Sequence, residues 1–124
     1  MAVPSSSAIF DRFLRRAVVI TDRLDLGILH RIFYETSQVS GHALDSFEFL
    51  FRTRPYSPTL DAEIWAFKHS DRLSEDPETG SLIIRNGGRP VPTDDEKTCE
   101  QVVLTLIKLL ERELSAVPTQ GGAR

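Results

Sequence analysis

The side chains best suited to binding a partner lie between Arg54 and His69. Tyr56 stands between two prolines, and Trp65 and His69 follow it four residues apart from each other. Residues four apart share one face of an α-helix. Trp and Tyr combine a large apolar surface with a polar group and often anchor protein interfaces. Tyr56, Trp65 and His69 are therefore the candidates for binding a partner protein. The alternatives are that Trp65 is covered by a later segment of the chain and that Tyr56 only locks its turn.

Basic side chains form a second candidate set. Its members are Arg52, Arg54, Lys68, Arg72, Arg85 and Arg89. Arg and Lys bind phosphate groups, so their convergence at one edge of a sheet would suit DNA. The alternative is a solvated surface, in which these charges alternate with those of Glu75, Asp76 and Glu78. The predicted helix that starts at Pro58 carries Asp61 and Glu63 in its first turns. In a recognition helix this is the end that normally enters the DNA groove, so these two carboxylates would repel the phosphates there.

Residues suited to catalysis or metal binding do not form a recognisable arrangement. His30, His42 and His69 are scattered, and none stands near Cys99 or a carboxylate at the spacing of a zinc site or a nucleophile and its base. Gly87–Gly88 is an isolated pair and lacks the pattern of a phosphate-binding loop. We therefore predict a protein without catalytic residues, metal or cofactor, in which Cys99 belongs to the core.

Length and composition limit the class of protein. A chain of 124 residues with 40% hydrophobic and 27% charged residues suffices for one domain with its own core. A single cysteine excludes an intrachain disulfide, and the sequence predicts neither a signal peptide nor a membrane span, which favours a cytoplasmic protein. The net charge of −3 provides no general attraction to nucleic acid or to anionic lipid.

The segment from Ser46 to Ser70 must position the partner-binding candidates. Its phenylalanines at 47, 49 and 51 occupy alternate positions, which predicts a strand with one buried face. Pro55 and Pro58 end this strand because proline has no amide donor. Ser57 before Pro58 is the N-cap of a helix with proline at its first position, and this helix is expected to run to about His69. Its inner side would carry Leu60, Ile64 and Phe67.

Two helices are expected before this segment. Apolar residues recur at helical spacing from Ala8 to Arg23, although the β-branched residues 18–20 leave a strand as the alternative there. Asp25 is a suitable N-cap for a second helix and Gly41 a suitable end. The connection between the two helices is short, which favours close packing. The side that faces solvent would carry Arg12, Arg15 and Arg16.

A hairpin and a long helix are expected after it. Residues 72–75 and 81–85 are predicted to pair across a short turn and to lie beside the phenylalanine strand. Thr93 with Glu96 three residues later is a capping box, so a helix is expected from there to about Ser115. Its broad apolar arc would lie across the domain, or part of it would form a dimer interface.

Three stretches resemble the SocA-like, or Panacea, antitoxin domain family, within a block from about Arg15 to Asn86. They are LGILHRIFYE (Leu26–Glu35), FEFLFR (Phe47–Arg52) and RPYSPTLDAEI (Arg54–Ile64). The aromatic strand, the Pro-Tyr-Ser turn and the following helix that opens with a leucine are typical of that family, although Arg54 stands where it usually has glycine. The resemblance implies a non-catalytic regulatory protein associated with toxin control, and it leaves open whether that control works through protein or DNA contact.

The predicted fold class is α+β and mostly helical: a winged-helix-like domain with a small antiparallel sheet and three helices, plus a long C-terminal amphipathic helix. The predicted divisions are a flexible leader (1–7), the winged-helix-like domain (8–92), the C-terminal helix (93–117) and a disordered tail (118–124). Two functions stay open. One is an antitoxin-like regulator that binds another protein, such as a toxin, and the other is a winged-helix transcriptional regulator that binds DNA. A homodimer through the C-terminal helix is a further expectation.

Overall fold

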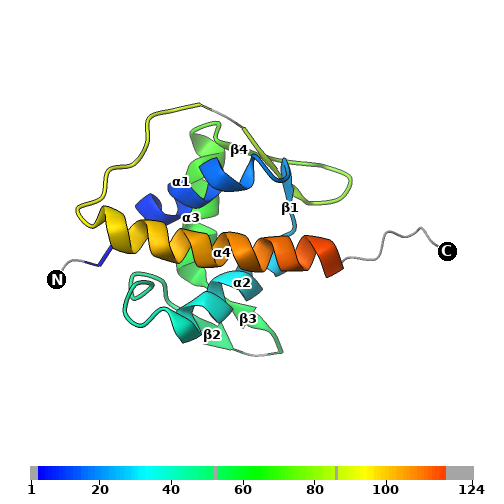
Figure 1. Ribbon diagram of the computed structural model, residues 1–124. Coiled ribbons are helices and arrows are strands. Elements are labelled where there is room, and N and C mark those ends of the chain that lie inside the picture. Colours follow the sequence, from blue (N-terminus) through cyan, green and yellow to red (C-terminus); the bar gives the residue numbers. More distant parts are fainter. Residues whose placement is uncertain (1–2, 52, 86, 117–124) are drawn as a thin grey trace.

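Over residues 3–51, 53–85 and 87–116, which the computed structural model describes, the chain forms four helices and five short strands (Figure 1). The helices are α1 (Ser6–Ala17), α2 (Leu26–Val39), α3 (Pro58–His69) and α4 (Glu96–Ala116). The strands are β1 (Arg23–Leu24), β2 (Leu50–Phe51), β3 (Pro55–Tyr56), β4 (Leu73–Glu75) and β5 (Leu82–Ile84). The mostly helical α+β class, the small antiparallel sheet and the long C-terminal helix are confirmed. The predicted tail, residues 118–124, lies outside the described residues.

The predicted caps begin α2 and α3. The Asp25 carboxylate accepts a hydrogen bond from the Ile28 amide at 3.0 Å. The Ser57 hydroxyl accepts one from the Leu60 amide at 3.0 Å, with Pro58 at the first helical position. These side chains satisfy amide donors that have no partner within the first helical turn. Both helices therefore start where the sequence predicted.

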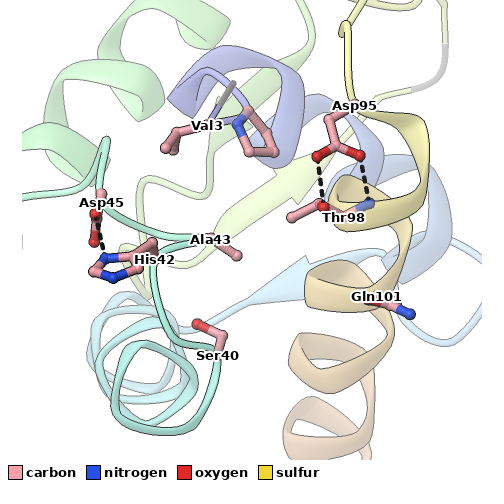
Figure 2. A pocket seen from close by; sticks show the side chains of 9 residues that line it. Val3, Ser40, His42, Ala43, Asp45, Asp95, Thr98 and Gln101 are labelled. Carbon is pink, nitrogen blue, oxygen red and sulfur yellow. Dashed lines mark hydrogen bonds and ion pairs between the residues drawn. The ribbon is translucent and has the colours of Figure 1, made fainter. Parts of the chain in front are cut away.

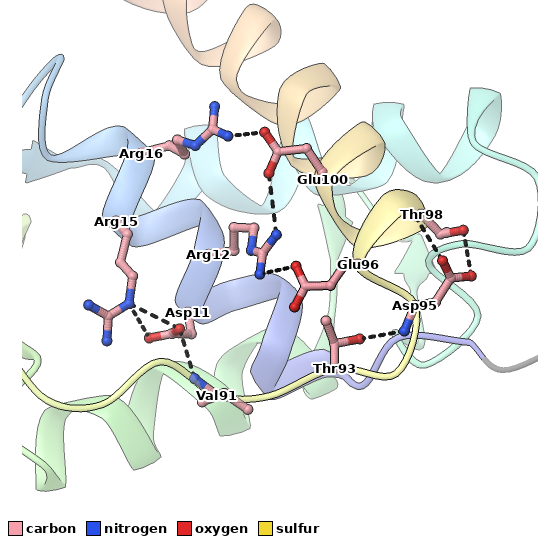
Figure 3. Close-up of polar contacts among 10 residues, drawn as sticks. All are labelled: Asp11, Arg12, Arg15, Arg16, Val91, Thr93, Asp95, Glu96, Thr98 and Glu100. Carbon is pink, nitrogen blue, oxygen red and sulfur yellow. Dashed lines mark hydrogen bonds and ion pairs between the residues drawn. The ribbon is translucent and has the colours of Figure 1, made fainter.

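The other two helices have different limits. α1 is capped by Ser5 and ends at Ala17, and residues 18–20 form a turn. The predictions of a helix up to Arg23 and of a strand at 18–20 are therefore wrong. α4 starts later than the capping box predicted. The Asp95 carboxylate accepts from the Thr98 amide at 3.0 Å and from its hydroxyl at 2.6 Å, so Asp95 caps the helix (Figure 3).

The three-stranded sheet has the order β1-β5-β4, and all pairs are antiparallel. The β4–β5 hairpin was predicted, whereas β1 takes the place expected for the phenylalanine strand: Arg23 pairs with Ile83 and Leu24 with Leu82. Only the end of the phenylalanine stretch is a strand, β2, and it folds back on β3 as a separate two-stranded sheet. Pairing with β3 closes a loop of a few residues and costs less chain entropy than pairing across the domain.

α4 passes in front of α3 and packs on α1 and α2, and the core lies between these helices (Figure 1). Phe10 is its centre: its ring contacts those of Phe67 at 5.0 Å and Phe33 at 6.3 Å, both edge-on, the arrangement that aromatic pairs favour. α4 buries Cys99, Val102, Val103, Leu106 and Leu110. The apolar arc of α4 therefore lies across the domain. Among the described residues of α4, Leu104 is the large hydrophobic side chain that remains exposed.

Ion pairs hold α4 in this position. Arg12 lies between Glu96 (2.5 Å) and Glu100 (3.4 Å), and Arg16 also binds Glu100 (Figure 3). The opposite half of α4 binds α2 through the pairs Arg31–Glu113 and Arg112–Glu35. These pairs are partly exposed and screened by solvent, so each contributes little to stability by itself. Arg12 and Arg16, which were expected to face bulk solvent, thus bind α4, whereas Arg15 binds Asp11 on its own helix. None of the helices in the described segments has the length and apolar composition needed to cross a membrane.

Candidate partner-binding surface

The outer face of α3 exposes Trp65. This side chain is 62% exposed, so it is not covered by the β4–β5 hairpin or by α4. Its indole packs on the His69 ring, with 3.9 Å between ring centroids. His69 Nδ1 lies 2.9 Å from the Trp65 carbonyl oxygen, which can only accept, so Nδ1 carries the proton and donates. Ala62 and Ala66 are exposed on the same side of the helix, and their small side chains leave the indole accessible.

Tyr56 extends this surface toward the start of α3. Its hydroxyl donates a hydrogen bond to Asp61 Oδ2 at 2.9 Å, and Asp61 lies one helical turn before Trp65. This hydrogen bond, together with partial burial and the negative charge of Asp61, raises the pKa of Tyr56 above its ordinary value. The exposed edge of Tyr56 therefore adjoins α3. We call the surface formed by Tyr56, Asp61, Ala62, Trp65, Ala66 and His69 the Trp65 face.

Tyr56 also locks its turn, which was the alternative role expected from the sequence, because it contacts His30. Its ring stacks on the His30 imidazole with 5.0 Å between centroids. His30 is 7% exposed, and its Nδ1 accepts a hydrogen bond from the buried Ser57 amide at 3.0 Å. Burial lowers the pKa of His30, although the charge of Asp61 opposes the shift, so the neutral acceptor form is favoured. His30 thus joins α2 to the Pro-Tyr-Ser turn, which the sequence reasoning missed.

A second apolar area adjoins Tyr56 at the β2–β3 hairpin. A cavity of about 390 Å³ is lined by Leu50, Thr53, Arg54 and Tyr56. Phe51 is 63% exposed, and its ring rests on that of Tyr34 at 5.6 Å. The hairpin thus adds exposed hydrophobic surface to the Trp65 face. Strict alternation predicted that Phe51 is buried, and the fold-back of β2 onto β3 is the reason that it is not.

The basic candidates do not form one patch. Arg72 is 8% exposed and donates through Nη1 to Asp11 at 2.7 Å, so it belongs to the interior. Lys68 is paired with Glu75 at 2.6 Å. Arg54 lies in the β2–β3 hairpin, which precedes the start of α3. Arg85 follows β5, and its amide binds the carbonyl of Arg72 just after the end of α3. Because the twelve residues of α3 span about 18 Å, Arg54 and Arg85 lie at opposite ends of this helix. Arg89 is exposed, and Arg52 lies outside the described residues.

Asp11 explains why Arg72 is buried. Its carboxylate also accepts from Arg15 Nε at 3.1 Å and from the Val91 amide at 3.1 Å (Figure 3). Burial alone would raise the pKa of Asp11, but the hydrogen bonds from Arg72, Val91 and Arg15 outweigh it and lower the pKa below its ordinary value. This buried network joins α1 to the start of β4 and to the segment before α4.

A further cavity does not belong to the Trp65 face. It measures about 520 Å³ and lies between residues 40–45 and the start of α4 (Figure 2). Four of its polar side chains are paired within the cavity wall, His42 with Asp45 at 2.9 Å and Asp95 with Thr98, whereas the buried Ser40 hydroxyl has no hydrogen-bond partner among the described residues. Across the described segments, no three His, Cys, Asp or Glu side chains lie together as a metal site would require.

Comparison of the chain with protein-family models, with curated proteins and with solved structures found no match. The resemblance of Leu26–Glu35, Phe47–Arg52 and Arg54–Ile64 to the SocA-like antitoxin family therefore stays a prediction.

Proposed function

We propose that this chain is a non-enzymatic, antitoxin-like regulatory protein of the cytoplasm, which acts by binding another protein through the Trp65 face. The observation that carries the proposal is the exposure of Trp65 on a helix where small side chains surround it. A solvent-exposed indole is costly to hydrate, and its burial by a partner recovers that free energy. Tryptophan anchors of this kind dominate many protein interfaces.

The geometry of Trp65 favours binding because the side chain is already ordered. The His69 ring lies against the indole, and the hydrogen bond from Nδ1 to the Trp65 carbonyl holds that ring in place. A preorganised anchor loses less rotamer entropy when a partner covers it. Asp61, at the edge of the same face, is already bonded to Tyr56. The polar groups of the face thus support the anchor and suit recognition better than catalysis.

The test is capture of a partner from the native host by the purified full chain, with Trp65→Ala as the variant. Leu104→Ala is the matched control, because Leu104 is also an exposed large hydrophobic residue but lies on α4. The partner identified by mass spectrometry is then titrated calorimetrically. We expect Trp65→Ala to weaken binding by at least about 30-fold, which corresponds to the ~2 kcal/mol of an interface anchor. Leu104→Ala should bind as the wild-type chain does.

Equal affinity of the Trp65→Ala and wild-type chains for that partner would overturn the proposal. A change in folding does not confuse the result, because the substitution of an exposed side chain is expected to alter the free energy of unfolding by less than ~1 kcal/mol. Circular dichroism of both variants checks this. Light scattering on the same samples tests the homodimer through α4, which has less support because α4 buries most of its apolar arc against α1 and α2.

A DNA-binding transcriptional regulator is the second candidate. What supports it is the element order α1, β1, α2, β2, β3, α3, β4, β5, which agrees with that expected of a winged helix apart from the inserted β2–β3 hairpin and would make α3 the recognition helix. The outer face of α3 opposes it, because it presents Asp61 and Trp65 in place of base-reading donors. Binding to phosphates weakens steeply with salt. Duplex binding that cannot be detected by fluorescence anisotropy even at about 50 mM salt would remove this candidate.

A further inference from the structure

Asp61 supplies the negative charge of the Trp65 face. Its side chain is exposed, and its Oδ2 atom accepts the Tyr56 hydroxyl at 2.9 Å. Within the described segments, no lysine, arginine or histidine side chain forms an ion pair with it. The Oδ1 atom of Asp61 is thus open to a positively charged ligand, and the Tyr56 hydroxyl orients the carboxylate that carries it.

The cations on the elements around this face are engaged elsewhere. Lys68 of α3 is paired with Glu75 of β4 at 2.6 Å. Arg54 of the β2–β3 hairpin reaches to the start of α2, where its Nη1 atom lies 3.9 Å from the position that a Cβ on Gly27 would take. The Asp25 carboxylate lies 3.2 Å from the same position, so Arg54 has an acidic neighbour of its own there. The charge of Asp61 is therefore left for a partner to balance.

Trp65 offers an aromatic surface beside this carboxylate. His69 packs on the indole from the following helical turn, whereas Asp61 and Ala62 lie in the preceding turn. Most of the indole stays open, because Trp65 is 62% exposed and Ala62 has only a methyl group. The Cβ atoms of residues four apart in a helix are separated by about 6 Å. A cation within about 6 Å of the indole, the distance at which a cation–π contact forms, can therefore also reach Asp61.

We propose that the Trp65 face binds an arginine side chain of the partner protein, which stacks on the indole and donates to the Asp61 carboxylate. A guanidinium group is planar, so it can lie on an aromatic ring and still direct its N–H groups sideways to an acceptor. A lysine ammonium group is compact and strongly hydrated, and it meets the two requirements less well. The net charge of −3 favours approach of a basic partner. That the arginine belongs to a protein rests on the proposed function, whereas the guanidinium site itself does not.

The test uses Trp65 as its own reporter, since it is the single tryptophan of the chain. The ¹⁵N-labelled full chain therefore gives one indole N–H signal by NMR, and acetyl-arginine amide is titrated against it. Acetyl-citrulline amide, which has the same shape without the charge, is the reference, and sodium chloride keeps the ionic strength constant. We expect the signal to move and to saturate with the arginine compound, with a dissociation constant of about 10–100 mM for one exposed cation–π contact and one exposed ion pair. The citrulline compound should bind at least about threefold more weakly.

Asp61→Asn removes the charge and keeps an oxygen atom that can accept from Tyr56. It should weaken binding of the arginine compound roughly threefold, which is within the range for exposed ion pairs. Glu78→Gln is the matched control, because Glu78 is also an exposed carboxylate but lies in the turn between β4 and β5. This variant should bind the arginine compound as the wild-type chain does. Circular dichroism of both variants checks that the fold is retained.

Four results would overturn the proposal. They are equal binding of the citrulline and arginine compounds, equal affinity of Asp61→Asn and the wild-type chain, tighter binding of acetyl-lysine amide than of acetyl-arginine amide, and movement of the indole signal with protein concentration alone. The last would show that a second copy of this chain covers the face. The titration contains no partner protein, so its failure leaves the capture experiment untouched. Conversely, a captured partner that binds Trp65→Ala as well as wild type removes the proposed function and leaves the guanidinium site standing.

Discussion

Replacement of His30 by alanine removes the acceptor of a hydrogen bond inside the domain. The Ser57 amide, which donates to Nδ1 at 3.0 Å, is buried and would lose its partner. An unsatisfied buried amide costs about 1–3 kcal/mol. The stack of His30 on Tyr56 adds about 0.5–1.5 kcal/mol. The expected loss is therefore about 1.5–4.5 kcal/mol, at the lower end if water enters the vacated space. For a domain of this size, at about 4 °C per kcal/mol, that lowers Tm by about 6–18 °C.

Urea unfolding followed by circular dichroism, with calorimetry for Tm, measures this loss. His42→Ala is the control, because His42 is exposed and its substitution is expected to change the free energy of unfolding by less than ~0.5 kcal/mol. Comparable stabilities of the two variants would refute the conclusion that His30 holds the turn before α3. The m-value should stay constant, since the native fold is retained.

The same contact predicts a dependence of stability on pH. Burial lowers the pKa of His30, whereas the unfolded chain titrates near ~6.5. As the pH falls below ~6.5, the unfolded state binds a proton that the native state does not, so stability is complete above this pH and decreases until the lowered native pKa is reached. The slope approaches ~1.4 kcal/mol per pH unit for one proton. The difference in stability between wild type and His30→Ala should therefore shrink with acidification. A constant difference between pH 7.5 and about pH 5 would contradict the assignment.

Three further predictions concern the core and α4. Asp11→Ala should destabilise the fold by about 3–5 kcal/mol in urea unfolding, because it leaves the buried charge of Arg72 unpaired. Asp95→Ala should lower the free energy of unfolding more than Thr93→Ala does in the same measurement, because Asp95 caps α4. A larger loss for Thr93→Ala would show that Thr93 is the cap. Cys99 is buried, and burial raises the pKa of its thiol, so its reaction with a thiol reagent at neutral pH should be slow until denaturant is added.

Several features of the fold were predictable because they depend on neighbours in sequence. Ser57 and Pro58 begin α3 wherever that helix packs, since the hydroxyl reaches an amide three residues ahead. The β4–β5 hairpin was predictable from its turn for the same reason. β1 has only two residues and no periodicity of its own, and its partner in β5 lies about 60 residues away. Such a strand exists only once the rest of the domain presents an edge to it.

For the candidate site, too, some features depend on residues that are near in sequence and others depend on distant segments. Helical spacing alone placed Trp65 and His69 on one face of α3, because it depends only on the residues per turn. Whether that face is covered depended on the path of α4, which packs on α1 and α2 and leaves Trp65 exposed. Arg72 was indistinguishable in sequence from the exposed arginines, and its partner Asp11 comes from 61 residues earlier. The sequence by itself determined the local caps, turns and helical faces, whose energies arise within a few residues. The tertiary structure alone decided burial and long-range pairing, because these depend on which distant segments exclude water from each side chain.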